Sequence, residues 1–198
     1  HELALKHGFV FIHPYDDAAV VAGQGTLALE LLEDAPDLDT LVIPVGGGGL
    51  AAGCAAAALE LKPGIRIFGV EVEGYPAMAQ RLAGKPVQVG GPTVAEGIAV
   101  RDVGELPLAL LRRFGTEVLV VPEHAVEQAI AMLAEGAKLV AEGAGAAGLA
   151  ALLAFPERFA GHRVGIPVCG GNIDARALSN VLLRQLLRDG RILRLVFD

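Results

Sequence analysis

Four consecutive glycines, Gly46–Gly49, separate an apolar segment from an alanine-rich one in the stretch TLVIPVGGGGLAAG. Glycine loses more conformational entropy on folding than any other residue, so a run of four is unfavourable unless the backbone itself is needed there. A strand that turns through bare backbone into a helix brings free N–H groups and a helix N-terminus together, and this arrangement binds anions. The stretch therefore predicts a strand–turn–helix unit with a phosphate-binding loop. Tight packing of a helix on a sheet is the alternative explanation.

Short apolar runs alternate with helical patterns along the whole chain. The runs are nearly continuously apolar, which is typical of parallel strands that are covered on both faces. We therefore predict one α/β domain, residues 1–198, with an open, mainly parallel twisted sheet and helices on both faces. The predicted strands are residues 9–12, 40–45, 66–72, 117–121, 163–168 and 192–197, and the predicted helices are residues 2–6, 16–32, 50–61, 76–83, 123–140, 144–154 and 174–188.

Three segments fall at the carboxyl ends of predicted strands, where open α/β sheets bind their ligands. They are the glycine run, VEVEGYP at residues 70–76 and CGGNID at residues 169–174. Residues 84–108 are rich in Gly and Pro, and we expect an irregular excursion or a site rim there. The sequence thus predicts the site at one edge of the sheet.

The composition excludes some classes of binding partner. The chain has 16 Lys and Arg against 23 Asp and Glu, a formal charge of −7, and no Trp. This balance argues against nucleic acid and anionic membrane as partners, and no apolar run reaches the length of a membrane span. Cys54 and Cys169 lie far apart, and the five histidines are scattered. We therefore expect a cytoplasmic protein without a disulfide framework or a metal site.

The glycine run also partly fits a dinucleotide-binding fingerprint. Gly46-x-Gly48-x-x-Ala51 matches the alanine variant, and Glu71 ends the next strand, where a ribose-binding acid could lie. However, four unbroken glycines exceed what that turn needs, and the second glycine loop, CGGN, has no place in the fingerprint. An NAD-binding domain is therefore the least favoured alternative.

Six motifs follow one another in the order HPYDDAAVVAGQGTLALEL, VIPVGGGGLAAG, GVEVEGYP, TVAEGIAV, EGAGAAGLAAL and PVCGGNID. Over nearly the whole chain, they resemble the threonine/serine dehydratase (threonine ammonia-lyase) family, pyridoxal-phosphate (PLP) enzymes of the tryptophan-synthase-β-like fold. The resemblance implies β-elimination of water from L-threonine or L-serine, leaving a 2-oxo acid and ammonia. It also implies PLP as cofactor, an amino-acid substrate and a homo-oligomer. A serine racemase-like enzyme and a non-catalytic module that binds phosphate ligands remain alternatives.

The resemblance also implies the contacts to the cofactor. The glycine run would hold the cofactor phosphate through backbone amides, and Cys169 stands where the family usually has a serine that meets the pyridine nitrogen. Glu142 matches a glutamate near the active site, and Gly97 matches a glycine beside the cofactor ring. The implied cofactor-binding residues are Gly46, Gly47, Gly48, Gly49, Leu50, Gly97, Glu142, Cys169 and Gly170.

Some relatives bind a divalent cation through positions that correspond to Glu71, the carbonyl of Tyr75 and residue 77. Residue 77 is an alanine here, so the second acid of that site is missing. We therefore expect no metal and interpret Glu71 as a hydrogen-bonded glutamate at the end of a strand.

The family's Schiff-base lysine lies in a Ser-x-Lys motif near the N-terminus, and this chain has no lysine in such a motif. The chain therefore resembles the C-terminal part of a catalytic region, without the upstream small domain and the catalytic lysine. We expect the isolated chain to be inert or nearly so and to associate with itself. Residues 191–198 could begin a further domain. The four lysines are Lys6, Lys62, Lys85 and Lys138.

Overall fold

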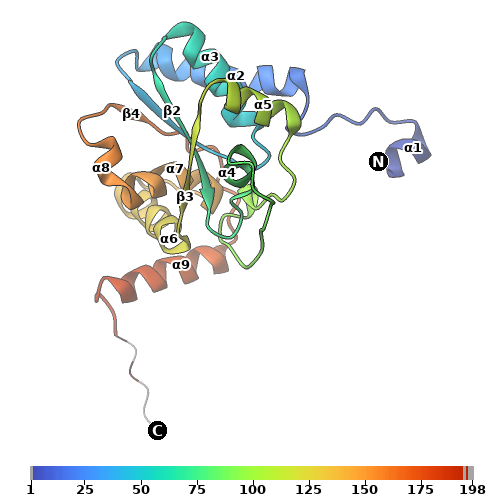
Figure 1. Ribbon diagram of the computed structural model, residues 1–198. Helices are drawn as coiled ribbons and strands as arrows, with labels where there is room; N and C mark the ends of the chain where they lie inside the picture. Colours follow the sequence, from blue (N-terminus) through green and yellow to red (C-terminus); the bar gives the residue numbers. More distant parts are fainter. Residues whose placement is uncertain (1, 194, 196–198) are drawn as a thin grey trace.

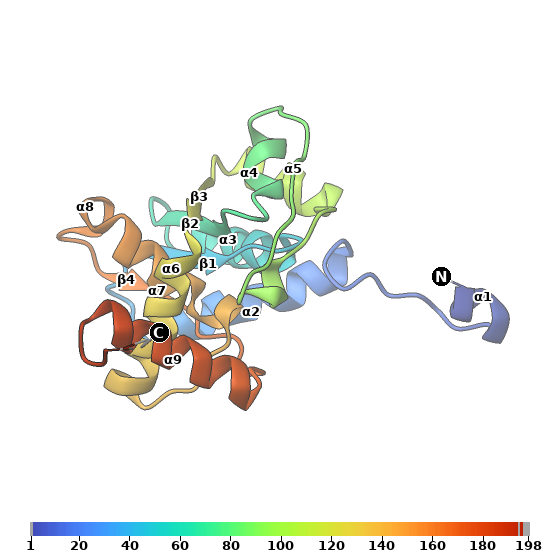
Figure 2. The same ribbon diagram turned by 90° about the horizontal axis from the view of Figure 1, so that it is seen from below.

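The computed structural model describes residues 2–193 and 195. Helices cover both faces of a small parallel sheet, and the N-terminal helix α1 (Glu2–His7) stands away from this body (Figures 1 and 2). The strands are β1 (Thr40–Pro44), β2 (Arg66–Val72), β3 (Glu117–Val121) and β4 (Val164–Gly165). The other helices are α2 (Ala18–Asp34), α3 (Gly49–Leu61), α4 (Ala77–Leu82), the 3₁₀ turn η1 (Glu96–Ile98), α5 (Glu105–Arg113), α6 (Glu123–Met132), the π-helical turn η2 (Leu133–Ala137), α7 (Gly143–Ala154), α8 (Pro156–Phe159) and α9 (Ala175–Arg188).

The four strands pair in the order β3-β2-β1-β4, and every pairing is parallel. The chain leaves β1 through α3 and enters β2 on one side, whereas after β3 it returns through α6 and α7 to β4 on the other side of β1. The direction of the connections thus reverses between β1 and β4. In open α/β sheets, the crevice at such a switch point is where ligands bind, so the topology itself selects the ends of β1 and β4.

The side chains of β1 alternate between two apolar cores, because successive residues of a strand point to opposite faces. Leu41 and Ile43 pack with α2, α3 and α5 on one face. Val42 packs with β2, β3, α6 and α7 on the other. All three residues are at most 1% exposed. The prediction of an α/β sheet with helices on both faces is confirmed.

Two predicted elements differ from the structure. Residues 9–12 form no strand: they run as an exposed segment between α1 and the body, because no neighbouring strand pairs with them. The predicted helix 123–140 ends early, since α6 stops at Met132 and η2 follows. Lys138 then has a φ of 59°, in the left-handed region, which ends the helical run.

The remaining differences are smaller. The strand predicted at 163–168 shortens to the two residues of β4. The irregular region 84–108 contains the turn η1 and the first turn of α5, whose residues Pro107 and Leu108 are buried. Three of the six residues of the strand predicted at 192–197, residues 194, 196 and 197, lie outside the described residues, and the described residues 192, 193 and 195 form no strand. Within the described residues, no helix combines the length and apolarity needed to cross a membrane.

Candidate functional site

The glycine run forms the turn between β1 and α3. Gly48 precedes the helix with a φ of 96°, a left-handed conformation that favours glycine. No side chain in the described part of the chain caps α3, whereas Asp17 caps α2 and Asp174 caps α9. The first N–H groups of α3 are therefore available to an anion, and the helix dipole favours a negative charge there.

A hollow of about 270 Å³ opens next to this turn. Every predicted cofactor residue except Gly170 lines it, although these residues come from four separate stretches of the chain. Besides them, Gln24 and Tyr15 contribute side chains from α2 and the segment that leads into it. The lining residues are Pro14, Tyr15, Gln24, Pro44, Gly46, Gly47, Gly48, Gly49, Leu50, Gly97, Ile98, Glu142, Ala144 and Cys169.

The glycines are also closely packed, as the packing explanation of the run expects. A Cβ at Gly46 would lie 3.0 Å from a methyl group of Val100, and one at Gly97 would lie 3.0 Å from Cβ of Ala144. These positions leave little room for a side chain, so bare backbone lies at the edge of the hollow. An uncapped helix N-terminus lined by backbone amides fits the phosphate of PLP without a basic side chain.

Glu142 and the loop after β4 form the opposite side of the hollow. The N–H of Glu142 donates to the carbonyl of Gly170 at 3.1 Å, which places Gly170 directly behind the hollow. A Cβ at Gly145 would lie 2.5 Å from the same carbonyl oxygen, so α7 packs tightly on this loop. Cys169 is exposed, yet desolvation by the atoms around its sulfur raises the pKa of the thiol, and the charge of Glu142 adds to this. The thiol is therefore neutral at pH 7.

Glu71 has a structural position outside the hollow. Its carboxylate accepts hydrogen bonds from the N–H groups of Met78 (2.7 Å) and Ala79 (2.9 Å), so it caps α4, and it is 1% exposed. Burial raises its pKa to about 7, although the two hydrogen bonds act in the opposite direction. A carboxylate held in this way faces α4 and not a ribose, which argues against the dinucleotide alternative. The phenol of Tyr75 donates to the carbonyl of Gly91 at 3.1 Å.

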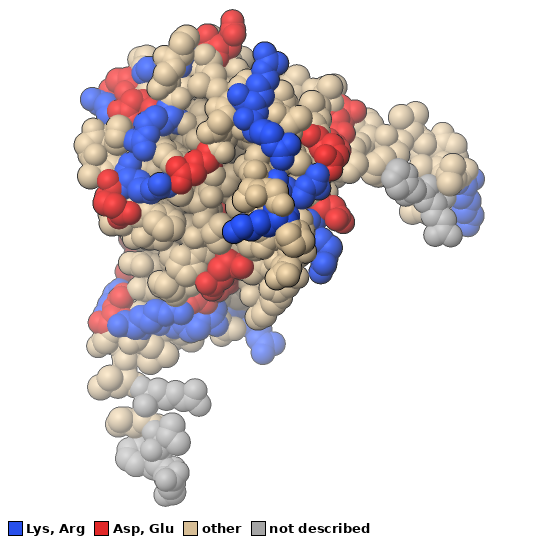
Figure 3. Space-filling view, viewed as in Figure 1, with Lys and Arg blue, Asp and Glu red and all other residues tan. Residues whose placement is uncertain are grey.

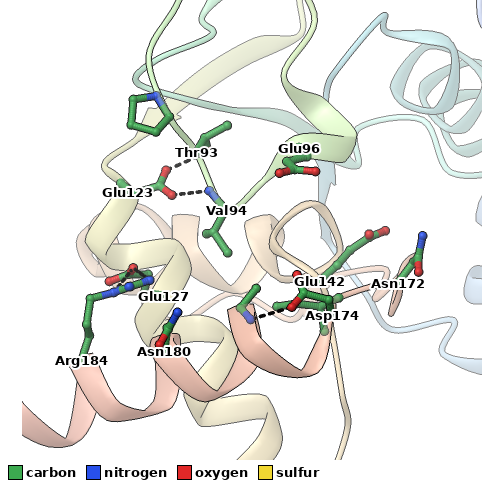
Figure 4. A pocket seen from close by; sticks show the side chains of 13 residues that line it. Thr93, Val94, Glu96, Glu123, Glu127, Glu142, Asn172, Asp174, Asn180 and Arg184 are labelled. Carbon is green, nitrogen blue, oxygen red and sulfur yellow. Dashed lines mark hydrogen bonds and ion pairs between the residues drawn. The ribbon is translucent and has the colours of Figure 1, made fainter.

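Among the described residues, no group of three or more His, Cys, Asp and Glu side chains could hold a metal ion. A second hollow, of about 440 Å³, lies beside the first, with Glu142 in both, and several acids line it (Figure 4). Most of these acids are engaged within the protein. Glu123 accepts from the hydroxyl of Thr93 at 2.8 Å, Asp174 caps α9, and Glu127 pairs with Arg184.

Residues of the segment HPYDD position two helices, α2 and α5. Asp17 accepts from the N–H of Ala19 and of Val20 at the start of α2. Asp16 accepts from the first two N–H groups of α5, and Nδ1 of His13 accepts from the N–H of Asp16 at 2.9 Å. Two aspartates before an apolar helix are a capping signal, so one of the two caps was predictable.

The surface mixes both signs of charge. On the face shown in Figure 3, lysines and arginines lie among aspartates and glutamates, and arginines gather along α9 at the lower edge. Two of the arginines of α9 pair with Glu127 of α6. Two of the three arginines of α9 thus make contacts within the protein.

The model of the family described as pyridoxal-phosphate dependent enzymes matches residues 1–170. The chain therefore belongs to this family of PLP-dependent enzymes, and the fold is that of fold-type-II PLP enzymes. It is 43% identical over 188 residues to L-threonine ammonia-lyase of Thermotoga maritima, covering 94% of this chain and 47% of the relative.

Two solved structures are similar to it. Maize serine racemase superimposes with a TM-score of 0.83 at 36% identity, covering 93% of this chain and 59% of that one. The processed form of threonine deaminase isoform 2 from Solanum lycopersicum superimposes with a TM-score of 0.85 at 31% identity, covering 91% and 54%. The chain spans about half the length of the curated relatives that it matches.

Proposed function

We propose that this chain is the PLP-phosphate-binding part of an ammonia-lyase that removes water and then ammonia from L-threonine, or from L-serine, to leave a 2-oxo acid. One observation carries the proposal: the uncapped N-terminus of α3 and the glycine turn open into a hollow that also holds Glu142 and Cys169. The similarity to L-threonine ammonia-lyase supports threonine as the substrate. The similarity to serine racemase keeps serine as the second substrate to test.

The residues that would hold PLP divide into two groups. The backbone amides of Gly46–Gly49 and Leu50 would bind the phosphate at the positive end of α3. Cys169 would face the ring nitrogen, and its thiol would be neutral because its pKa is raised. Gly97, which also lines the hollow, would lie beside the ring. Bound PLP would supply an electron-withdrawing ring that stabilises negative charge on the substrate.

The lysines of the chain lie away from the hollow. Nζ of Lys62 donates to the carbonyls of Pro36 (2.8 Å) and Leu38 (2.5 Å), and Nζ of Lys138 donates to that of Glu135. Lys6 and Lys85 are absent from the lining of the hollow as well. We propose that the amine that works with PLP comes from outside these 198 residues, so the chain alone binds cofactor without turnover.

We further propose a cytoplasmic protein that associates with itself. Both cysteines are free thiols, as in a reducing compartment. The N-terminal segment exposes large apolar side chains that the body of this chain does not cover, including Leu5 at 87% and Val10 at 87%. Sedimentation at micromolar concentration tests the association, and a monodisperse monomer would contradict it.

The experiment that tests the function is a PLP titration of the purified chain, followed by absorbance, then borohydride reduction and mass spectrometry. We expect saturable binding that inorganic phosphate competes away and no single labelled lysine. Gly48→Ala should abolish binding. Gly64→Ala is the matched control, because Gly64 has nearly the same φ, 95°, and a Cβ there would meet nothing within 4 Å. Saturable labelling of one lysine would show that the chain holds its own amine, and no binding at all would refute the proposal.

A further inference from the structure

Tyr15 occupies the space that a side chain at Gly47 would need. A Cβ at Gly47 would lie 2.2, 2.3 and 2.4 Å from Cγ, Cδ2 and Cδ1 of the Tyr15 ring. These distances are far below van der Waals contact, so the ring lies directly on the backbone of the turn. The ring and the turn come from segments about thirty residues apart in the sequence, which is why no pattern around the glycines reveals the contact.

The backbone at Gly47 does not itself require glycine. Within the glycine run, only Gly48 has a positive φ. An L-residue could therefore adopt the conformation of Gly47, and the ring of Tyr15 is the nearest obstacle to its side chain. Glycine is required at position 47 because the ring of Tyr15 packs against it, and not because the turn needs a positive φ there.

Tyr15 is held in place from several directions. Its hydroxyl donates to the carbonyl of Asp102 at 2.7 Å, and the ring of His13 lies edge-on to it with centroids 4.5 Å apart. The next residue, Asp16, caps α5. The carbonyl of Gly47 also accepts a hydrogen bond, from the N–H of Gly104 at 2.9 Å. The peptide of Gly47 is thus fixed both by a ring and by a hydrogen bond.

We propose that Tyr15 is a positioning residue of the phosphate cradle and that glycine is required at position 47 by Tyr15 and not by the ligand. The ring holds the turn so that its amides and the start of α3 face the hollow. The inference deepens the proposed function and rests on it for the binding measurement only, because the contact between Tyr15 and Gly47 also affects folding stability.

A double-mutant cycle tests this inference. Tyr15→Ala, Gly47→Ala and the combined variant are compared with the unmodified chain by urea unfolding and by titration with PLP and with inorganic phosphate. We expect Gly47→Ala alone to lower PLP affinity by about tenfold and to lower the urea midpoint. In the Tyr15→Ala background, Gly47→Ala should lower PLP affinity by less than about threefold, because the ring atoms that obstruct its side chain are gone.

Gly49 supplies the matched control. A Cβ at Gly49 would lie 2.9 to 3.0 Å from the carbonyl oxygen, Cα and Cβ of Tyr15, and these atoms remain after Tyr15→Ala. Gly49→Ala should therefore lower PLP affinity and the urea midpoint equally with and without Tyr15→Ala. Tyr15→Phe keeps the ring and loses only the bond to Asp102, so it should keep PLP affinity within about threefold.

The outcomes separate the two proposals. If Gly47→Ala is as harmful without the ring as with it, by both measurements, the inference about Tyr15 is wrong. If the unmodified chain binds neither PLP nor phosphate, the proposed function fails, and the urea midpoints alone still decide the coupling between Tyr15 and Gly47. If Gly47→Ala does not fold but the combined variant does, the inference is supported, since only removal of the ring distinguishes them.

Discussion

The N–H of Glu142 donates to the carbonyl of Gly170 at 3.1 Å, and the carboxylate of the same glutamate fills the space where Gly170 would carry a side chain. The residue before α7 and the loop after β4 thus form one wall. Because this wall contains Cys169 and faces the glycine turn, small changes in it should alter ligand binding more than stability.

Gly170→Ala should displace the carboxylate of Glu142. A Cβ at Gly170 would lie 1.9 Å from Oε1 of Glu142, but that atom ends a flexible side chain and can rotate away. We expect a stability loss below about 1 kcal/mol and a several-fold loss of PLP affinity. Gly145→Ala is the contrast: the obstacle there is the Gly170 carbonyl, 2.5 Å away, so roughly 2 kcal/mol should be lost in urea unfolding. Equal losses of stability would contradict this account.

The two glycines within α2 should respond to alanine in opposite directions. Gly23 is exposed, and a Cβ there would meet nothing within 4 Å, so Gly23→Ala should stabilise the chain by about 0.5–1 kcal/mol. Gly25 is buried, and its Cβ would lie 2.9 Å from the carbonyl of Gly53 in α3. Gly25→Ala should therefore destabilise. Thermal unfolding of both variants checks this, and a loss of stability in Gly23→Ala would show that another surface covers that residue.

Glu71 should make stability fall as pH rises. Its pKa is about 7 in the folded chain against an ordinary 4.5, so between these values the folded state binds more protons than the unfolded state. The stability due to Glu71 is fully present below about pH 4.5 and is lost as pH rises through about 7, by roughly 3 kcal/mol. Glu71→Gln lacks this dependence.

Urea unfolding of the unmodified chain and of Glu71→Gln across this range measures the difference in free energy of unfolding. The advantage of the unmodified chain should shrink as pH rises. A growing advantage would mean that the hydrogen bonds from Met78 and Ala79 outweigh burial and lower the pKa of Glu71.

Glu127 of α6 forms ion pairs with two arginines of α9. Removing these arginines should lower the free energy of unfolding more than removing the charge of Glu127. Its side chain is 6% exposed, whereas those of Arg184 and Arg188 are 48% and 41% exposed. Replacing both arginines with alanine leaves a buried carboxylate unpaired, which should cost roughly 3 kcal/mol. Glu127→Gln leaves two arginines that water can reach, and should cost about 1 kcal/mol. The reverse order in urea unfolding would contradict this explanation.

An exposed pair gives the control for this experiment. Arg191 pairs with Glu135, and both side chains are about half exposed, at 53% and 49%. Arg191→Ala should change stability by less than about 1 kcal/mol, and added salt should reduce the effect further.

Much of the fold was predictable from local patterns. The starts of the helices near residues 16 and 174 were predictable, because an aspartate that can cap a helix stands just before each apolar periodic run. The buried strands followed from their continuous apolar runs. Residues 9–12 show where this fails: Phe-Val-Phe-Ile has high strand propensity, but a strand needs a partner, and the sheet of the described residues offers none.

All the predicted cofactor-binding residues except Gly170 line the hollow, and glycine runs and a family resemblance made them visible in the sequence. The sequence also predicted that the glycine run and the CGGNID loop lie at one edge of the sheet, but not which contacts bring them together. Glu142 and Cys169 reach the glycine turn because β4 pairs with β1 and α7 packs on the sheet. Tyr15 and Gln24 were missed, since nothing in their own neighbourhood marks them as parts of the hollow.

The sequence by itself determined the secondary structure of the core, the acidic charge balance and the backbone freedom of the glycine turn, since each depends on residues that are neighbours in the chain. Only the tertiary structure decided which side of β1 receives β4, that Asp16 caps α5, and why Gly47 has no room for a side chain. Those relationships join residues that are distant in sequence, and close packing settles them only once the two cores have formed.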